Sequence, residues 1–107
     1  MRDLKKEIFK VVLLNAQNRV IDTVDVEEGT VNYASPVIRE IFQVALQHFA
    51  TSIICVHNHP SGVAEPSRED EVFTQRLNEA GKIMQIKVLD HLIIGNDQYF
   101  SFADRGR

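Results

Sequence analysis

The chain has 107 residues, of which 44% are hydrophobic and 25% are charged, and its formal net charge is −3. This length suits one domain with a single core, and the composition excludes disordered, fibrous and disulfide-built proteins. The charges are of mixed sign without a basic block, so nucleic acid is not an expected partner.

The apolar runs of the chain are short, and residues 11–14 and 53–56 are among the longest. Neither run approaches the ~20 residues that a helix needs to cross a bilayer, so we expect no membrane segment. The N-terminus is charged and lacks an apolar stretch of signal-peptide length, which predicts a cytoplasmic protein. The single cysteine, Cys55, lies in an apolar run and is expected to be a buried small hydrophobe.

The first elements predicted are two strands that form a hairpin. Residues 7–14 rise from a charged lead-in to a continuous apolar and β-branched stretch, the pattern of a strand covered on both faces. A polar turn at 15–18 separates it from a β-branched segment at 19–26, which we predict to be an antiparallel second strand. Residues 30–33 are a candidate for a short third strand.

A helix and a central strand are predicted next. Ser35 and Pro36 are typical of an N-cap and a first helical position. The apolar residues that follow recur at three- and four-residue steps, so one face of this helix packs on the sheet. Residues 51–56 are short, apolar and β-branched, which predicts a central strand. The apolar face of the helix comprises Ile38, Ile41, Phe42, Ala45, Leu46 and Phe49.

A second long helix is predicted to begin at Ser67 and to end at Gly81, with Phe73, Leu77 and Ala80 as its buried stripe. Residues 83–94 are consistent with one long strand or two short ones. The elements predict an α/β fold of the α+β-like kind, in which a single mixed β-sheet is flanked by two main helices. After that, 95–97 form a turn, 98–102 a last short strand, and 105–107 a frayed end.

Two histidines follow the central strand. His57 and His59 are two residues apart, so in extended backbone their side chains point to the same side. The pair alone is weak evidence, because two histidines at a strand end can equally form a solvated edge. The helix that opens with Ser67 and Asp70 makes a carboxylate available as a third ligand. Two imidazoles and one carboxylate leave the fourth position of a tetrahedral zinc site open to water, as a catalytic site requires.

Ser67 and Asp70 also have a purely structural explanation. Their Ser-x-x-Asp spacing resembles a capping box, although the usual third-position partner is Glu or Gln. The two roles can coexist, since a serine that caps a helix can still present its hydroxyl to a neighbouring oxyanion.

The order of these residues resembles the JAMM motif of MPN-domain metalloproteases. His57-Asn58-His59 is followed by seven residues before Ser67 and by two more before Asp70. Within that group the chain is similar to the RadC subfamily over nearly its whole length, through segments 56–62, 66–70 and 88–91.

The resemblance implies a JAB/MPN, cytidine-deaminase-like architecture over residues 1–107 and a Zn2+ cofactor held by His57, His59 and Asp70. It implies hydrolysis of a peptide or isopeptide bond in a protein or peptide substrate. Such enzymes also use an upstream glutamate, and Glu7 at the start of the first strand resembles it. The alternative for Glu7 is an exposed charge in a lysine-rich lead-in. Competing upstream carboxylates are Asp3, Glu27, Glu28 and Glu40.

Two features depart from the family pattern. Many RadC-like proteins carry an N-terminal region ahead of this domain, whereas here the chain begins a few residues before Glu7, so we expect a stand-alone catalytic module. Residues 63–65 differ from the Asp-Pro-Thr associated with this stretch, which leaves the shape of the loop open.

Three further polar residues are expected to support the site or to lie apart from it. His91, beside Asp90, is expected to act behind the ligands or in the structure, not as a ligand itself. His48 is expected to be solvated on the first helix. Asn58 points away from its neighbouring histidines in extended backbone and is expected to bond the adjacent backbone.

The expected mechanism is hydrolysis by zinc-activated water. Zinc lowers the pKa of its water toward ~7 and Glu7 accepts the proton, while the hydroxide attacks a carbonyl carbon. Zinc and the Ser67 hydroxyl then stabilise the oxyanion.

Other functions are weighed against this one. A catalytically silent MPN-like interaction module is the main alternative, and the DNA-repair label of the family suggests action on or near DNA, which the acidic balance does not support. A zinc nuclease is suggested only by the letters His57-Asn58-His59, and a zinc deaminase would need motifs that are missing. Exposed strand edges can pair between copies, so a homo-oligomer stays open.

Overall fold

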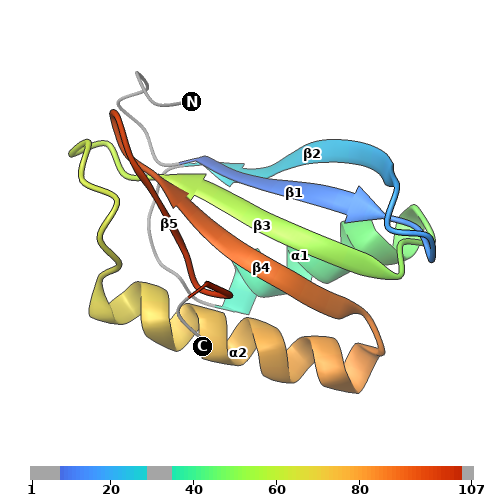
Figure 1. The fold of residues 1–107 in the computed structure, drawn as a ribbon. Coiled ribbons are helices and arrows are strands. Elements are labelled where there is room, and N and C mark those ends of the chain that lie inside the picture. Colours follow the sequence, from blue (N-terminus) through green and yellow to red (C-terminus); the bar gives the residue numbers. More distant parts are fainter. Residues whose placement is uncertain (1–7, 29–34, 105–107) are drawn as a thin grey trace.

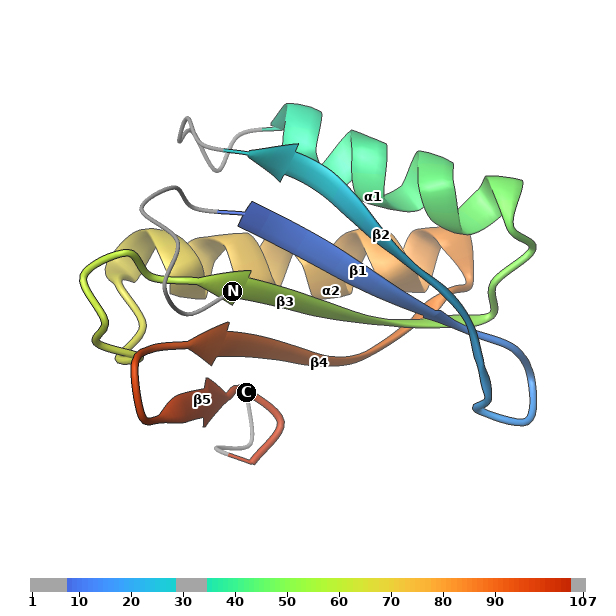
Figure 2. The same cartoon turned by 90° about the horizontal axis from the view of Figure 1, so that it is seen from above.

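The computed structural model describes residues 8–28 and 35–104. Within these ranges one five-stranded sheet has the spatial order β2-β1-β3-β4-β5, and both helices lie on one face of it (Figures 1 and 2). The predicted fold class, a mixed sheet with two main helices, is therefore confirmed. In chain order the elements are β1 (Ile8–Leu14), β2 (Val20–Glu28), α1 (Ser35–Gln47), β3 (Ser52–Asn58), α2 (Arg68–Met84), β4 (Lys87–Ile94) and β5 (Tyr99–Ser101).

The predicted hairpin is present as β1 and β2, which pair antiparallel. Its turn is closed by the side chain of Asn15, whose Oδ1 accepts hydrogen bonds from the backbone N–H groups of Gln17 and Arg19. Asn18 has a φ of 61°, the left-handed conformation that asparagine tolerates better than most residues.

The central strand β3 pairs antiparallel with β1 on one side and parallel with β4 on the other. Parallel neighbours need a crossover connection, and α2 supplies it. As a result the C-terminal ends of β3 and β4 and the start of β1 lie together at one end of the strands. His57 there lies opposite both Phe9 and Ile93. Loops from several elements converge at this end of the sheet, and the candidate site predicted from the sequence lies here.

The core lies between the sheet and the two helices. Alternate residues of β1 point into it because successive side chains of a strand face opposite sides. Cys55 of β3 is fully buried there, as expected, and burial raises the pKa of its thiol to about 12. The main core residues are Phe9, Val11, Leu13, Ile41, Phe42, Ala45, Ile53, Cys55, Phe73, Leu77 and Ile86.

The prediction that Gly81 ends the second helix is wrong. α2 continues to Met84 and is capped by Gln85, whose φ of 59° is left-handed. A Cβ at Gly81 would lie 2.6 Å from the carbonyl oxygen of Ile86, so this glycine permits close packing inside the helix. Ile83, predicted to be in a strand, is consequently a helical residue with 81% of its surface exposed.

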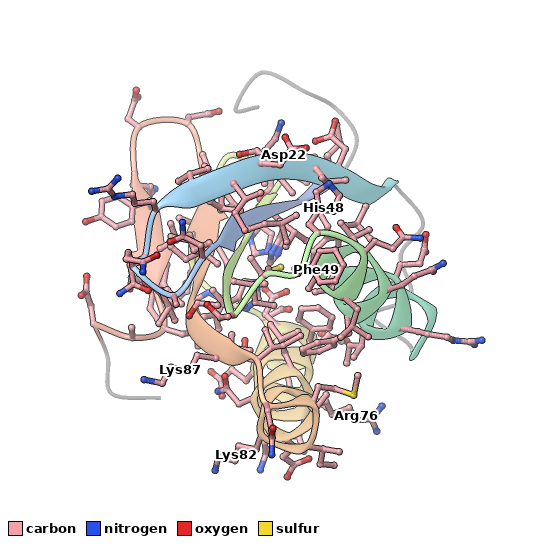
Figure 3. All side chains as sticks on the ribbon, turned by 90° about the vertical axis from the view of Figure 1, so that its right-hand side faces the viewer. Asp22, His48, Phe49, Arg76, Lys82 and Lys87 are labelled. Atoms are coloured by element: carbon pink, nitrogen blue, oxygen red, sulfur yellow. The ribbon has the colours of Figure 1, made fainter. Side chains whose placement is uncertain are left out.

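The prediction that Phe49 lies on the buried face of the first helix is also wrong. α1 ends at Gln47, and Phe49 adopts a φ of 55° with 88% of its surface exposed (Figure 3). The N–H groups of Phe49 and Ala50 bond to the carbonyls of Leu46 and Ala45, which is a Schellman ending without glycine. The buried position passes to Ala50.

Smaller boundaries also shift. α1 begins at Ser35, one residue before the predicted first helical position, and β3 continues past 56 to include His57 and Asn58. The predicted strand at 30–33 and the predicted frayed end at 105–107 lie outside the described residues. A search of the described helices finds none with the length and apolar character needed to traverse a bilayer.

Candidate metal centre

The structure brings His57, His59 and Asp70 together where β3 ends and α2 begins. One ligand atom of each lies within 4.8 Å of the other two. Nε2 of His57 is 3.3 Å from Oδ1 of Asp70, and Nε2 of His59 is 2.9 Å from Oδ2 of the same carboxylate. His57 and Asp70 have no exposed side-chain surface, whereas 13% of the His59 side chain is exposed. Two of the three side chains are therefore fully buried, and the group is accessible to solvent beside His59.

The start of α2 fixes Asp70. The Ser67 hydroxyl oxygen accepts a hydrogen bond of 3.1 Å from the backbone N–H of Asp70, and Oδ2 of Asp70 accepts one of 2.8 Å from the backbone N–H of Ser67. The predicted capping box is therefore confirmed, and Asp takes the place of the usual Glu. The positive end of the helix dipole also favours a carboxylate at this position.

The backbone fixes the orientation of His59. Its Nδ1 lies 2.9 Å from the carbonyl oxygen of Val63, and a carbonyl oxygen can only accept a hydrogen bond. Nδ1 of His59 therefore carries a proton. In the neutral ring Nε2 then has its lone pair directed toward Asp70, the tautomer that a ligand through Nε2 requires.

His57 is held by rings and by a third histidine. The ring of Phe9 stacks on it with centroids 4.7 Å apart. Its Nδ1 lies 2.8 Å from Nε2 of His91 on β4. His91 therefore stands behind a predicted ligand, and its ring is 1% exposed. Burial lowers the pKa of His91 to about 3.

The carboxylate of Asp70 stays ionised. Burial alone would raise its pKa, but hydrogen bonds from the protonated forms of His57 and His59 and from the backbone N–H of Ser67 outweigh this effect. The pKa of Asp70 is consequently held well below its usual range. A charged carboxylate is the form in which aspartate binds a metal ion.

This donor set could hold a divalent metal ion. Zinc ligands at about 2.0–2.1 Å in a tetrahedron lie about 3.3–3.4 Å from one another. Nε2 of His57 and Oδ1 of Asp70 are 3.3 Å apart, and the three ligand atoms lie within 4.8 Å of one another. In the neutral form of His59, Nε2 and Oδ2 of Asp70 face each other with lone pairs 2.9 Å apart. A proton or a cation between them removes that repulsion, so the three residues could hold a divalent metal.

Other predicted residues have mixed outcomes. Glu7 and Asp3 lie outside the described residues, as do the side chains of Glu27 and Glu28, so the identity of the general base stays a prediction. Glu40 is described, lies on α1 and does not belong to the group of converging ligand atoms.

The expected backbone bond of Asn58 exists, but to the neighbouring strand. Its buried Oδ1 accepts a hydrogen bond of 2.7 Å from the backbone N–H of Ile8, at the start of β1. His48 is only partly solvated: its Nδ1 lies 2.9 Å from the Val44 carbonyl and its Nε2 3.4 Å from Asp22 (Figure 3). It follows the end of α1 and does not belong to the group of converging ligand atoms.

Sequence reasoning missed Thr74 and Phe102. The hydroxyl of Thr74 lies 2.6 Å from Nδ1 of His91, and the ring of Phe102 stacks on the same histidine. Thr74 is four residues after Asp70 on α2, so its position on the same helical face was an available signal. Phe102 had none, because its contact depends on how the chain folds back after β5.

Comparison with known proteins agrees with this geometry. A family described as RadC-like JAB domain matches residues 1–107. A UPF0758 protein of Trichlorobacter lovleyi is 50% identical over 106 residues, covering 99% of this chain and 46% of the relative. A UPF0758 protein of Clostridioides difficile is 50% identical over 104 residues, covering 97% and 44%. A third, from Caldanaerobacter subterraneus, is 50% identical over 106 residues, covering 99% and 46%.

The chain thus spans about half the length of the curated relatives it matches. The family match covers residues 1–107. The mixed sheet with its two helices and the histidine-aspartate group are consistent with that family. This chain belongs to the RadC-like JAB domain family.

Proposed function

We propose that the chain is a zinc-dependent hydrolase of the JAMM type that cleaves a peptide or isopeptide bond in a protein or peptide substrate. The observation that carries the proposal is the convergence of His57, His59 and Asp70, whose ligand atoms lie within 4.8 Å of one another. Membership of the RadC-like JAB family supports it.

The residues of the chain divide the work as follows. His57, His59 and Asp70 would hold the metal, which when bound would supply an acidified water and a positive charge for the carbonyl oxygen of the substrate. Ser67 accepts the N–H of Asp70 through its oxygen, so its own hydroxyl proton can be donated to the oxyanion. Glu7 accepts the proton of the attacking water and returns it to the departing amine.

Metal binding is tested first, with zinc as the probe. The chain is purified, stripped with a chelator and titrated with zinc beside His59→Ala, Asp70→Asn and the control His48→Gln, which removes a histidine elsewhere. We expect one zinc per chain in the unsubstituted protein and the control, and a large loss of affinity in the other two. Absence of stoichiometric zinc binding in the unsubstituted chain would overturn the proposal.

Hydrolysis is tested second, on peptide and isopeptide substrate panels with the zinc-loaded chain. We expect cleavage that Glu7→Gln abolishes without loss of zinc, because a general base acts on the proton and not on the metal. Zinc binding without cleavage of any panel member would favour a silent interaction module instead. Cleavage that survives Glu7→Gln would assign the general base to another carboxylate.

A further inference from the structure

Three hydrogen-bonding groups in a row lie behind His57, and the last is a backbone carbonyl of α2. Nδ1 of His57 is 2.8 Å from Nε2 of His91, and Nδ1 of His91 is 2.6 Å from the Thr74 hydroxyl oxygen. The same hydroxyl donates a hydrogen bond of 2.8 Å to the backbone carbonyl oxygen of Asp70. The row therefore runs from one predicted ligand, through two buried side chains, to the backbone of another.

The direction of these bonds follows from the number of protons available. Thr74 has one hydroxyl hydrogen, and the carbonyl of Asp70 takes it because a carbonyl can only accept. Nδ1 of His91 must then be the donor to the Thr74 oxygen. In its neutral form His91 has no proton left for Nε2, which becomes an acceptor for Nδ1–H of His57.

The consequence for His57 is a single tautomer. With its proton on Nδ1, the neutral ring of His57 has a lone pair on Nε2, the atom that lies 3.3 Å from Asp70. A proton on Nε2 instead would block that atom as a metal ligand. The direction of the row therefore decides whether His57 can bind a metal.

The surroundings of His91 favour the neutral ring. Phe102 stacks on it with centroids 4.9 Å apart and planes 9° from parallel, and Phe73 meets it edge-on with centroids 5.5 Å apart. An imidazolium ion between such rings would be poorly solvated. Asp90 keeps Phe102 in place, since its carboxylate accepts hydrogen bonds from Ser101 Oγ and from the backbone N–H of Ala103.

We propose that His91 and Thr74 are positioning residues for the metal centre: they fix His57 as the tautomer whose Nε2 faces the metal. This inference rests on the proposed metal site and deepens it. Packing alone does not explain a histidine at this position, since a phenylalanine would also fill the space between Phe73 and Phe102. It also links His57 on β3 with Asp70 on α2 through side chains of β4 and α2, three elements that lie side by side in Figure 1.

Two matched pairs of variants test the proposal. His91→Phe retains a ring between Phe73 and Phe102 but removes the acceptor, whereas His91→Gln places an amide oxygen where it can accept from His57. Thr74→Val keeps the shape but lacks the hydroxyl, and Thr74→Ser retains the hydroxyl. His48→Gln is the control for removal of a histidine. Thermal melts of each metal-free variant establish that it is folded.

The first measurement is zinc affinity by chelator competition. Loss of a group behind a metal ligand weakens metal binding by about 10–100-fold, and we expect this for His91→Phe, with a smaller loss for Thr74→Val. His91→Gln and Thr74→Ser should recover most of the affinity. Zinc affinity in folded His91→Phe equal to that of the unsubstituted chain would overturn the proposal, as would a loss in His91→Gln as large as in His91→Phe.

The second measurement is the tautomer of His57, determined from the nitrogen chemical shifts of its ring in the metal-free protein. We expect the proton on Nδ1 in the unsubstituted chain and on Nε2 in His91→Phe. This measurement also separates the two proposals. If the chain binds no zinc, the proposed metal site is wrong, but the nitrogen shifts of the metal-free protein still show which nitrogen of His57 carries the proton. A proton on Nε2 with none on Nδ1 of His57 in the unsubstituted chain would overturn the inference.

Discussion

Gly95 lies so close to Gly62 that a Cβ added at Gly95 would be 2.4 Å from the Gly62 carbonyl oxygen. This contact joins the turn after β4 to the loop that carries His59. The same two segments are joined by hydrogen bonds from the N–H of His59 to the carbonyl of Ile94 and from the N–H of Asn96 to the carbonyl of Gly62. The position of His59 therefore depends on a close approach of two backbones.

Gly95→Ala is expected to displace the His59 loop. A clash with backbone atoms forces a shift, and such overpacking costs about 1–3 kcal/mol in the free energy of unfolding. Because the loop moves with it, zinc affinity of the folded variant should also fall. Denaturant unfolding and zinc titration of the same sample measure the two effects.

Gly81→Ala is the matched control for this prediction. A Cβ there would be 2.6 Å from the carbonyl oxygen of Ile86, which is also a clash with backbone. Gly81 lies near the C-terminal end of α2, whereas Asp70 lies at its start. We expect it to lower stability while the folded protein binds zinc as before. Equal losses of zinc affinity in both variants would show that general loosening, and not the loop, is responsible.

Asp70→Asn separates the two roles of Asp70. An asparagine oxygen can still accept the N–H of Ser67, so the start of α2 should stay capped, whereas the negative charge that binds a cation is lost. We expect a metal-free melting temperature close to that of the unsubstituted chain and no measurable stabilisation by zinc. Differential scanning calorimetry with and without zinc checks both points.

Ser67→Ala provides the reverse comparison. It removes the hydroxyl that accepts the N–H of Asp70, and loss of an N-cap costs about 0.5–2 kcal/mol. Zinc should still bind, since the three ligands remain, but turnover should fall because a donor to the oxyanion is missing. Unchanged turnover in a folded, zinc-loaded variant would remove Ser67 from the mechanism.

Removal of metal by a chelator is expected to lower stability without unfolding the chain. A ligand present at 100 times its dissociation constant stabilises the folded state by about 2.7 kcal/mol. The metal-free site is held by the capping box and by the bond from His59 to the Val63 carbonyl, so the fold does not depend on the ion. Circular dichroism of the chelated protein and its melting curve test this; complete unfolding on chelation would contradict it.

Cys55 gives a prediction for alkaline pH. Its thiol has a pKa raised from 9.0 to about 12 by burial in the folded chain, so in the unfolded chain it ionises first. The stabilisation from the neutral buried thiol is complete below pH 9 and is lost as pH rises toward 12, at about 1.4 kcal/mol per pH unit. Urea unfolding from pH 8 to pH 10.5 should show a steeper loss than in Cys55→Ala. An identical slope in the two proteins would contradict the assignment.

The candidate metal site was predictable from the sequence because its geometry is local. The spacing of His57 and His59 on extended backbone and the Ser67 to Asp70 step at a helix start each fix side-chain directions over a few residues. The site then needs only that β3 and α2 be adjacent, and they are consecutive elements.

The support behind the ligands was not accessible, because it depends on pairing between distant segments. The contact of His91 with His57 follows from the parallel register of β3 and β4, and the stacking of Phe102 follows from the turn after β5. The prediction that Gly81 ends the second helix was wrong for a related reason. A glycine in a helical pattern signals either an ending or a close contact, and only the neighbouring strand decides between them.

The capping box at the start of α2 has a consequence for judging distant relatives of this chain. A relative without the proposed activity that served only as a scaffold would still gain stability from Ser67 and Asp70, because they cap the start of α2. His59, partly exposed and placed on a loop, bonds the Val63 carbonyl of that loop but does not begin a helix. Replacement of His59 is therefore better evidence that a relative lacks the proposed activity than retention of the serine and the aspartate is evidence that it has it.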